Sequence, residues 1–482
     1  MDEAPRSLPA IIQGGMGIGV SNWVLARAVS RLGQLGVVSG TCIDSVLVRR
    51  LQDGDIGGHV RRAMEHFPIR GVAEEVLNRY FLSGGRTEGT PYRLLPLWKQ
   101  VVTDARERLT MMAAFVEVYL AKEGHDGPIG INLLTKVQMP NLPTLYGAML
   151  AGVSCVLMGA GIPKEIPGVL DAFAENQPAT LRFDVEGLER GEVEALRFEP
   201  RRHFDREPPA LTRPVFLPIV ASHSLAAMLA RKSNGRVDGF VVEGPIAGGH
   251  NAPPRGRLEI NPRGEPVYGQ RDLVDVAEMR ALGLPFWLAG GTGSPEGLAS
   301  ALEQGAAGVQ VGTLFAYSDE SGLDPMLKAQ VLRDVRNGRI DVLTDPLASP
   351  TGFPFKVVTL DGTLSGDAEY AARERICNLG YLRIAYKRGD GRIGYRCAAE
   401  PVEAYVEKGG TVENTVGRKC LCNALMANIG LAQIASGTIE RPLLTSGDEL
   451  RNLGTFLGDR DQYSAADAIE HLLSGVPAGV PA

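Results

Sequence analysis

The chain has 482 residues, which is too long for one average domain and fits a barrel of about 250 residues with insertions and one appended domain. Its net charge of −6 and its 44% of hydrophobic residues suit a globular enzyme and argue against a nucleic-acid-binding protein, which would carry a basic stripe. No apolar run is long enough to span a membrane, the N-terminus lacks the apolar core of a signal peptide, and six cysteines are too few for a secreted disulfide scaffold of this length. These features predict a cytoplasmic protein.

Short apolar runs alternate with helical patterns along the first two thirds of the chain, as in a parallel sheet with crossover helices. The runs are apolar almost throughout, which is typical of strands covered on both faces. We predict eight strands, at residues 10–14, 36–40, 128–134, 153–159, 215–222, 237–243, 286–290 and 308–312. Together they predict an α/β fold, a (β/α)8 TIM barrel over residues 1–320, with an open doubly wound sheet as the alternative.

Two connections between these strands are too long for simple βα units. Residues 41–127 contain several amphipathic patterns, including residues 104–122, and predict a helical insertion after the second strand. Residues 163–213 include a charged stretch and predict a small lid or a pair of strands. Both connections are therefore expected to lie outside the barrel core.

The first strand ends in a glycine-rich turn that suits contact with a flat ring. Gln13 places a polar side chain at the strand end, and Gly14 and its neighbours let the backbone lie against a ring. Met16 is polarisable enough to pack on a ring edge, although a methionine of this kind is more often core filler. Asn132 interrupts the third strand with an amide that needs a partner, either backbone or ligand.

A histidine follows the strand at residues 237–243. His250 comes after a glycine pair that ends at Gly249, and barrel enzymes keep catalytic groups at such strand ends. An imidazole can donate or accept a proton near neutral pH. A lone histidine is usually structural, but here three other strand ends carry matching signals. His223, just past the fifth strand, is a weaker candidate.

The strand at residues 286–290 leads through glycines directly into a helix. Gly290, Gly291 and Gly293 allow close backbone approach, and Ser294 is a good N-cap for the helix. The free N–H groups at the helix start point towards an anion, so the turn predicts a phosphate site, with a plain tight turn as the alternative.

The eighth strand strengthens the phosphate interpretation. It places Gly312 and Thr313 at its C-terminal end, and phosphate sites after strands seven and eight recur in barrel enzymes. The two strand ends form one compact cradle, without the Gly-x-Gly-x-x-Gly opening of a dinucleotide site. We therefore expect a mononucleotide rather than a dinucleotide.

Five stretches together resemble the nitronate monooxygenase (2-nitropropane dioxygenase-like) family, which is related to FMN-dependent enoyl-ACP reductases. They are residues 12–17, 130–133, 247–250, 289–293 and 308–313, in the order in which the family has them. The resemblance implies that His250 is the active-site histidine. It also implies an FMN site. The residues at the ring would be Gln13, Gly14, Met16 and Asn132, and those at the phosphate would be Gly290, Gly291, Gly293, Gly312 and Thr313. Gly249 and Gln310, which lie inside the matching stretches, are assigned to the same site. The long insertions and the region after Leu314 depart from the compact family barrel.

The resemblance implies an FMN-dependent oxidoreductase that oxidises alkyl nitronates or a related carbanion with dioxygen. His250 would deprotonate a neutral nitroalkane or steer the anion. One alternative is an NAD(P)H-dependent enoyl-thioester reductase that uses FMN. Another is a non-catalytic flavin subunit for electron transfer or assembly. The expected partners are a small-molecule substrate and dioxygen, with NAD(P)H in the first alternative; neither nucleic acid nor membrane is expected, and a homo-oligomer is left open.

Residues 321–482 are expected to form a C-terminal α+β extension that packs on the barrel. A hairpin is predicted at residues 381–397, and helical patterns at residues 369–379 and after Cys420. The extension holds four of the six cysteines: Cys377, Cys397, Cys420 and Cys422. Four thiolates can hold zinc or an iron–sulfur cluster, but the Cys-x-Cys spacing is unusual, and we favour free thiols without a metal.

Overall fold

Eight parallel strands form the centre of the protein. The structure is a computed structural model that describes residues 8–435 and 437–476. The strands are β1 (Ile11–Gln13), β2 (Gly36–Ser39), β3 (Ile129–Leu134), β4 (Cys155–Gly159), β8 (Val215–Val220), β9 (Phe240–Glu243), β10 (Phe286–Ala289) and β11 (Gly308–Val311). They pair in the order β1-β11-β10-β9-β8-β4-β3-β2. Gln13 N donates to Leu35 O (2.9 Å) and Leu35 N to Ile11 O (3.1 Å), which joins β1 to the start of β2. The predicted TIM barrel and its eight strands are confirmed.

The barrel interior is filled by side chains from alternate strand positions, as in other eight-stranded barrels. Ile12, Val37, Leu157 and Val241 belong to a small buried cluster that is separate from the core between strands and helices. Trp287 joins this cluster, and its indole N–H donates to the carbonyl of Pro9 (2.9 Å). The strands are apolar on both faces because one face meets this cluster and the other meets the helices.

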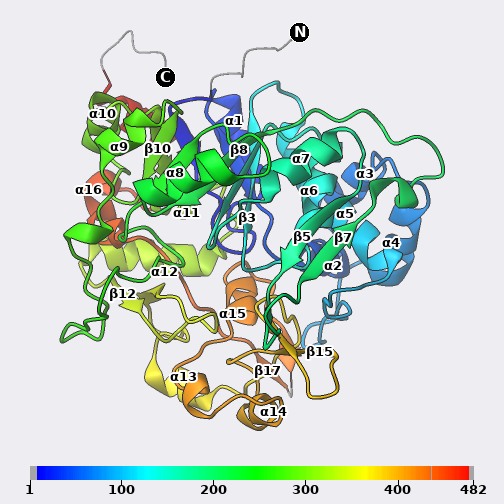
Figure 1. Ribbon diagram of the computed structural model, residues 1–482. Helices are drawn as coiled ribbons and strands as arrows, with labels where there is room; N and C mark the ends of the chain where they lie inside the picture. Colours follow the sequence, from blue (N-terminus) through cyan, green and yellow to red (C-terminus); the bar gives the residue numbers. More distant parts are fainter. Residues whose placement is uncertain (1–7, 436, 477–482) are drawn as a thin grey trace.

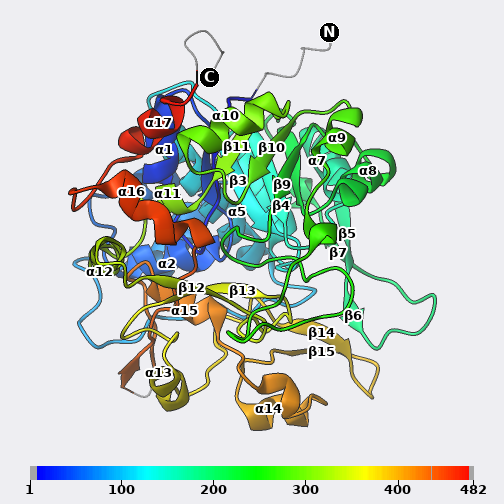
Figure 2. The same ribbon diagram turned by 90° about the vertical axis from the view of Figure 1, so that its left-hand side faces the viewer.

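The helices around the barrel come from two distant parts of the chain. Those that alternate with the strands are α1 (Trp23–Arg31), α5 (Asp104–Lys122), α6 (Asn141–Leu150), α7 (Ile166–Ala174), α8 (His223–Lys232), α9 (Val276–Ala281) and α10 (Pro295–Glu303). After β11 only the short α11 (Thr313–Ala316) follows directly. The place of the eighth helix, between α10 and α1, is taken by α17 (Ala465–Leu473) (Figure 2). The chain therefore leaves the barrel after β11 and returns to it near its end.

Both long connections have the predicted character. The first holds α2 (Ile43–Gln52), α3 (His59–Met64) and α4 (Val72–Tyr80), which confirms a helical insertion after the second strand. The second contains an antiparallel pair of strands, β5 (Ala179–Phe183) and β7 (Glu194–Phe198). The connection between them carries β6 (Val185–Glu186), which pairs with a strand of the C-terminal region. The insertion thus reaches away from the barrel to meet the extension.

The extension contains α12 (Pro325–Arg336), β12 (Asp341–Asp345), β13 (Phe355–Thr359), α13 (Asp367–Ala372), β14 (Ile384–Lys387), β15 (Ile393–Arg396), α14 (Val402–Glu407), α15 (Leu421–Ala427), β16 (Ile434–Ala435), β17 (Thr438–Ile439) and α16 (Leu453–Leu457). Most of the extension, from β12 to β17, lies beneath the barrel in both ribbon views, whereas α16 lies beside the barrel (Figures 1 and 2). The short 3-10 helices of the chain are η1 (Pro200–His203), η2 (Gln270–Asp272), η3 (Glu413–Thr415) and η4 (Asp448–Asn452). The hairpin β14–β15 and the helix after Cys420 occur as predicted. The division of the chain at residue 320 stays a prediction.

The helix expected at residues 369–379 is wrong in its extent. α13 ends at Ala372, and Arg373 takes an extended backbone conformation. The Arg373 guanidinium pairs with Glu440 at 2.6 Å, and both side chains are largely buried. The helix thus ends just before the residue whose side chain is held by this ion pair. Within the described part of the chain, no helix is long and apolar enough to cross a membrane.

Candidate active site at the carboxyl ends of the strands

A cavity of about 220 Å³ opens where the barrel strands end. The carboxyl ends of parallel strands are the usual position of active sites in barrel enzymes. Nine of the twelve predicted site residues line this cavity: Gly14, Met16, Asn132, Gly249, His250, Gly290, Gln310, Gly312 and Thr313. The strand ends thus bring most of the candidate residues to one place.

Gly291 and Gly293 do not line the cavity, and neither does Gln13. Its Nε2 donates to Ser21 Oγ (2.9 Å), and its Oε1 accepts from Val37 N (3.0 Å). The side chain therefore ties the glycine turn after β1 to β2. His223, the weaker candidate, is the first residue of α8 and lines neither this cavity nor the second one described below.

Two amide side chains leave acceptors unsatisfied at the cavity. Asn132 Oδ1 and Gln310 Oε1 are buried without a hydrogen-bond partner, while Asn132 Nδ2 donates to Gly15 O (3.2 Å). A Cβ at Gly15 would lie 2.2 Å from Asn132 Cβ, so only glycine allows this approach. A buried acceptor without a donor costs free energy unless a ligand supplies an N–H group. An isoalloxazine ring carries such a group, so this end of the cavity fits a flavin.

The glycine turn after β10 binds an anion from the chain itself. Gly290 and Gly291 have φ of +82° and +81°, which favours glycine at both positions. Gly293 N donates to Glu449 Oε1 (2.8 Å), and the Gly291 amide also hydrogen-bonds this carboxylate. Burial raises the pKa of Glu449, whereas the two amides act in the opposite direction. In this structure the turn therefore hydrogen-bonds a carboxyl group of the extension.

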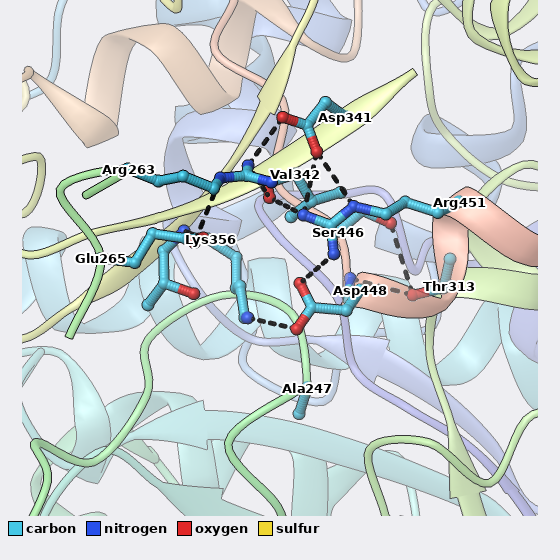
Figure 3. A network of polar contacts seen from close by, with 12 residues as sticks. Ala247, Arg263, Glu265, Thr313, Asp341, Val342, Lys356, Ser446, Asp448 and Arg451 are labelled. Carbon is cyan, nitrogen blue, oxygen red and sulfur yellow. Dashed lines mark hydrogen bonds and ion pairs between the residues drawn. The ribbon is translucent and has the colours of Figure 1, made fainter. Parts of the chain in front are cut away.

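Polar contacts hold the segment around Glu449 against the barrel (Figure 3). Thr313 Oγ1 accepts from Gly447 N (3.0 Å), which places this segment at the end of β11. Two ion pairs fix it to strands of the extension, Asp448 to Lys356 of β13 at 2.7 Å and Arg451 to Asp341 of β12 at 2.9 Å. The predicted phosphate cradle is therefore built jointly by the barrel and the extension.

The extension also positions His250. Its backbone forms an antiparallel bridge with Phe355, the first residue of β13, and the two rings pack edge to face with centroids 4.9 Å apart. His250 Nε2 is hydrogen-bonded to Ser349 Oγ (2.7 Å). Burial, together with the nearby positive charge of Lys136, lowers the pKa of His250 to about 3. The imidazole is therefore neutral at neutral pH and can accept a proton only when one of its nitrogens loses one.

A second cavity of about 260 Å³ adjoins the first at His250. Both cavities are lined by His250, Glu243 and Ile219, and the outer one continues past Tyr268 and Phe353. Burial raises the pKa of Glu243 to about 8, so this carboxyl group is mostly protonated at pH 7. The two cavities together form one two-chambered site with the imidazole at the junction.

Sequence reasoning missed three kinds of residue in this site. Glu243 was detectable, because it is a charged residue at the end of an apolar strand, where barrel enzymes place functional groups. Ser349 and Glu449 lie in loops of the extension and carry no local motif. Lys136 follows β3 in a segment that has no distinguishing pattern.

The four cysteines of the extension are free thiols, and Cys397, Cys420 and Cys422 are buried. Among residues 8–435 and 437–476, no group of three or more histidine, cysteine, aspartate or glutamate side chains has the arrangement of a metal site.

Comparisons with known proteins point to one family. Residues 192–342 match the family model described as nitronate monooxygenase. A nitronate monooxygenase of Pseudomonas aeruginosa is 30% identical over 157 residues, which are 33% of this chain and 38% of that protein. A probable nitronate monooxygenase of Bacillus subtilis is 36% identical over 96 residues, 20% of this chain and 26% of that protein. The matches thus span well under half the length of these relatives.

Two solved structures are similar over nearly the whole chain at low identity. FabK from Thermotoga maritima has a TM-score of 0.49 and 17% identity, over 98% of this chain and 93% of that one. A nitroalkane oxidase from Streptomyces ansochromogenes has a TM-score of 0.45 and 16% identity, over 97% of this chain and 95% of that one. The family resemblance predicted from the five sequence stretches is confirmed by the family model and the curated relatives.

Proposed function

We propose that this chain, a relative of the nitronate monooxygenases through the second half of its barrel, is an FMN-dependent oxidoreductase that oxidises an alkyl nitronate or a related carbanion. The observation that carries the proposal is the cavity at the strand ends. There, the unsatisfied acceptors of Asn132 and Gln310 and the imidazole of His250 line the same space. The matching relatives carry the name nitronate monooxygenase, which supports this substrate class.

The residues present suit FMN at both ends of the cavity. Asn132 and Gln310 would hold the ring edge, and Met16 would pack against it. Gly290, Gly291, Gly293, Gly312 and Thr313 would hold the phosphate, in exchange for the contacts that Glu449 makes to this turn. Bound FMN would supply a two-electron acceptor.

His250 would handle the substrate proton. Because its pKa is lowered to about 3, the imidazole stays neutral at neutral pH. It therefore forms no ion pair with an anionic substrate. A neutral imidazole can take the α-proton of a nitroalkane or hydrogen-bond a nitronate oxygen. Side chains of the extension such as Phe355 and Leu444 line the same cavity and reduce the access of water to the imidazole, which strengthens such contacts.

The proposal is tested on the purified protein in two steps. Mass spectrometry of the heat-released cofactor should find FMN; FAD, or no flavin under any expression condition, would sink the assignment. The flavin is then mixed without oxygen with a nitronate, NADH and NADPH in parallel. Rapid bleaching by the nitronate supports the oxidase.

The outer cavity favours a second candidate, an NAD(P)H-dependent enoyl-thioester reductase. The outer chamber extends the site beyond His250 and is larger than a short nitroalkane needs, so it suits a longer acyl chain. Ala252 lines the outer chamber alone, so Ala252→Trp should fill it and leave the inner chamber open. If this variant loses activity with a long enoyl thioester and NAD(P)H bleaches the flavin, the reductase is correct. Unchanged nitronate oxidation in the variant would favour the first proposal.

A further inference from the structure

A continuous chain of side chains connects His250 to Lys136, a half-buried lysine. His250 Nε2 contacts Ser349 Oγ at 2.7 Å, and Ser349 Oγ contacts Thr351 Oγ1 at 2.8 Å. Lys136 Nζ donates to Thr351 Oγ1 at 3.4 Å, the longest link of the chain. Two hydroxyl groups therefore lie between an amine and an imidazole, each within hydrogen-bonding distance of the next.

The loop that carries the hydroxyl groups is held in place by the rest of the extension. Arg418 Nη1 donates to the carbonyl of Ser349 (2.7 Å), and Lys419 N donates to that of Ala348 (2.9 Å). The backbone N–H of Thr351 also donates to Ser349 Oγ (3.2 Å). Ser349 is fully buried. These backbone contacts hold the two hydroxyl groups in place. They do not change when a proton moves between Lys136 and His250.

The surroundings of Lys136 favour loss of the proton from its ammonium group. The Lys136 ammonium lies over the ring of Phe353, and Thr351 is its hydrogen-bond partner. Burial lowers the pKa of Lys136 to about 7, so both protonation states are populated near neutral pH. The same positive charge acts on His250, which shows that the two groups are electrostatically coupled.

We propose that Ser349 and Thr351 form a proton relay between Lys136 and His250, and that Lys136 sets whether His250 acts as an acid or as a base. The inference rests on the proposed function for the assignment of His250 to the reaction. Lys136, Thr351 and Ser349 act through His250 and are positioning residues.

The relay can run in two directions, because each hydroxyl group can donate or accept and the role of the imidazole nitrogen depends on its tautomer. When Lys136 is protonated, it donates to Thr351, Thr351 donates to Ser349, and Ser349 donates to Nε2 of His250. The imidazole then carries its proton on Nδ1 and can give it to a substrate carbanion while Nε2 takes a proton from Ser349. When Lys136 is neutral, all three bonds reverse, Nε2 carries the proton, and Nδ1 can accept one. Each transfer moves one proton along the chain and changes no oxidation state.

Other titratable groups line the two chambers but do not replace Lys136 in this role. They are Glu243, Arg255, Tyr268 and Asp272 in the outer chamber, and Glu449, Tyr317, Tyr381, Cys42 and Cys422 in the inner one, Glu243 lining both. Burial raises the pKa of Glu243 to about 8 and those of the lining tyrosines and cysteines above their usual values. Across the part of the chain that the structure describes, Lys136 is the charged group whose field shifts His250.

The relay is tested by nitrogen NMR of the histidine rings in the full-length protein as purified. The His250 signal is identified by its loss in His250→Gln. Between about pH 5.5 and 8.5, His250 should change from the Nδ1–H to the Nε2–H tautomer with a midpoint near pH 7, without becoming doubly protonated. Lys136→Met and Thr351→Val should each abolish the change, whereas Thr351→Ser keeps the hydroxyl group and should retain it. Lys232→Met, which removes an exposed lysine on α8, is the matched control and should leave the midpoint in place.

The outcomes separate the relay from the proposed function. The same midpoint in Lys136→Met, or a doubly protonated His250 in the wild-type protein near pH 6.5, would overturn the relay. In anaerobic flavin reduction, Thr351→Val should slow the reaction of a neutral nitroalkane by at least about tenfold and spare the nitronate, which has already lost its proton. If the tautomer changes as expected but neither substrate bleaches the flavin, the relay stands and the proposed function fails.

Discussion

The barrel and the C-terminal extension contribute to the same cavity in different ways. The barrel supplies glycines and amides at its strand ends, such as Gly15 against Asn132 and the turn at Gly290–Gly293. The extension supplies single side chains from loops, Ser349 beside the imidazole and Glu449 at the anion site. The comparison teaches that the strand ends of the barrel supply one side of the cavity, while the extension covers them with its own side chains and adds polar groups beside His250 and the glycine turn.

The largest effect is expected where the two regions meet at His250. His250→Ala should keep the flavin, because the predicted ring and phosphate contacts lie on other strands. Loss of a positioned acid–base group should lower turnover by about 10²–10⁴-fold. Stopped-flow flavin reduction measures this loss, and the flavin absorbance of the variant provides the control. Near-native turnover would show that the base lies elsewhere.

The next effect concerns stability, because His250 is neutral in the fold and would be charged in the unfolded chain. Its pKa is about 3 in the folded protein, against about 6.5 for an ordinary histidine. Below pH 6.5 the unfolded state therefore binds more protons, and stability is lost as the pH falls. Urea unfolding should show that the wild-type protein loses about 1–2 kcal/mol more than His250→Asn between pH 7 and pH 5. Equal losses in both proteins would mean that the extension does not shield this group from water.

A smaller effect is expected at the anion site. Glu449→Gln removes the negative charge that Gly293 and Gly291 hold, so the variant should bind FMN about tenfold more tightly, a gain of about 1.4 kcal/mol. Titration of the cofactor-free protein measures the affinity, with riboflavin as the ligand that lacks the phosphate. Riboflavin affinity should be unchanged, and Glu403→Gln, an exposed residue on α14, should alter neither. If the FMN affinity of Glu449→Gln equals that of the wild type, the phosphate is held by other groups.

The smallest effect is expected at the cysteines of the extension. Cys420 is buried among core side chains, and Cys420→Ser places a hydroxyl group in this setting. We expect a loss of about 1 kcal/mol in stability and no change in metal content or flavin affinity. Elemental analysis of anaerobically prepared protein provides the check. Stoichiometric zinc or iron that is lost in the variant would contradict the preference for free thiols.

The sequence predicted the barrel well because local patterns encode it. Runs of apolar residues define each strand, and the glycines at Gly290 and Gly312 mark strand ends that line the cavity, so local patterns are sufficient to locate them. Gln13 shows what a local pattern cannot predict. A polar residue at a strand end can hydrogen-bond either a ligand or the neighbouring strand, and Gln13 hydrogen-bonds β2. Ser349 and Glu449 were not predicted because their role depends on how distant loops pack. Residue 449 meets residue 293 only after the whole extension has folded.

The position of α17 has a consequence for how the protein is made. The outer layer of the barrel is incomplete until residues 465–473 reach the groove between α1 and α10. During synthesis, β11 leaves the ribosome well before this helix, and the apolar surfaces of its neighbours stay uncovered meanwhile. Such long-range closure slows folding, because ends that are far apart in sequence must be brought together. A nascent chain that stops within the extension would therefore be a substrate for chaperones and proteases, even though all eight strands are already present.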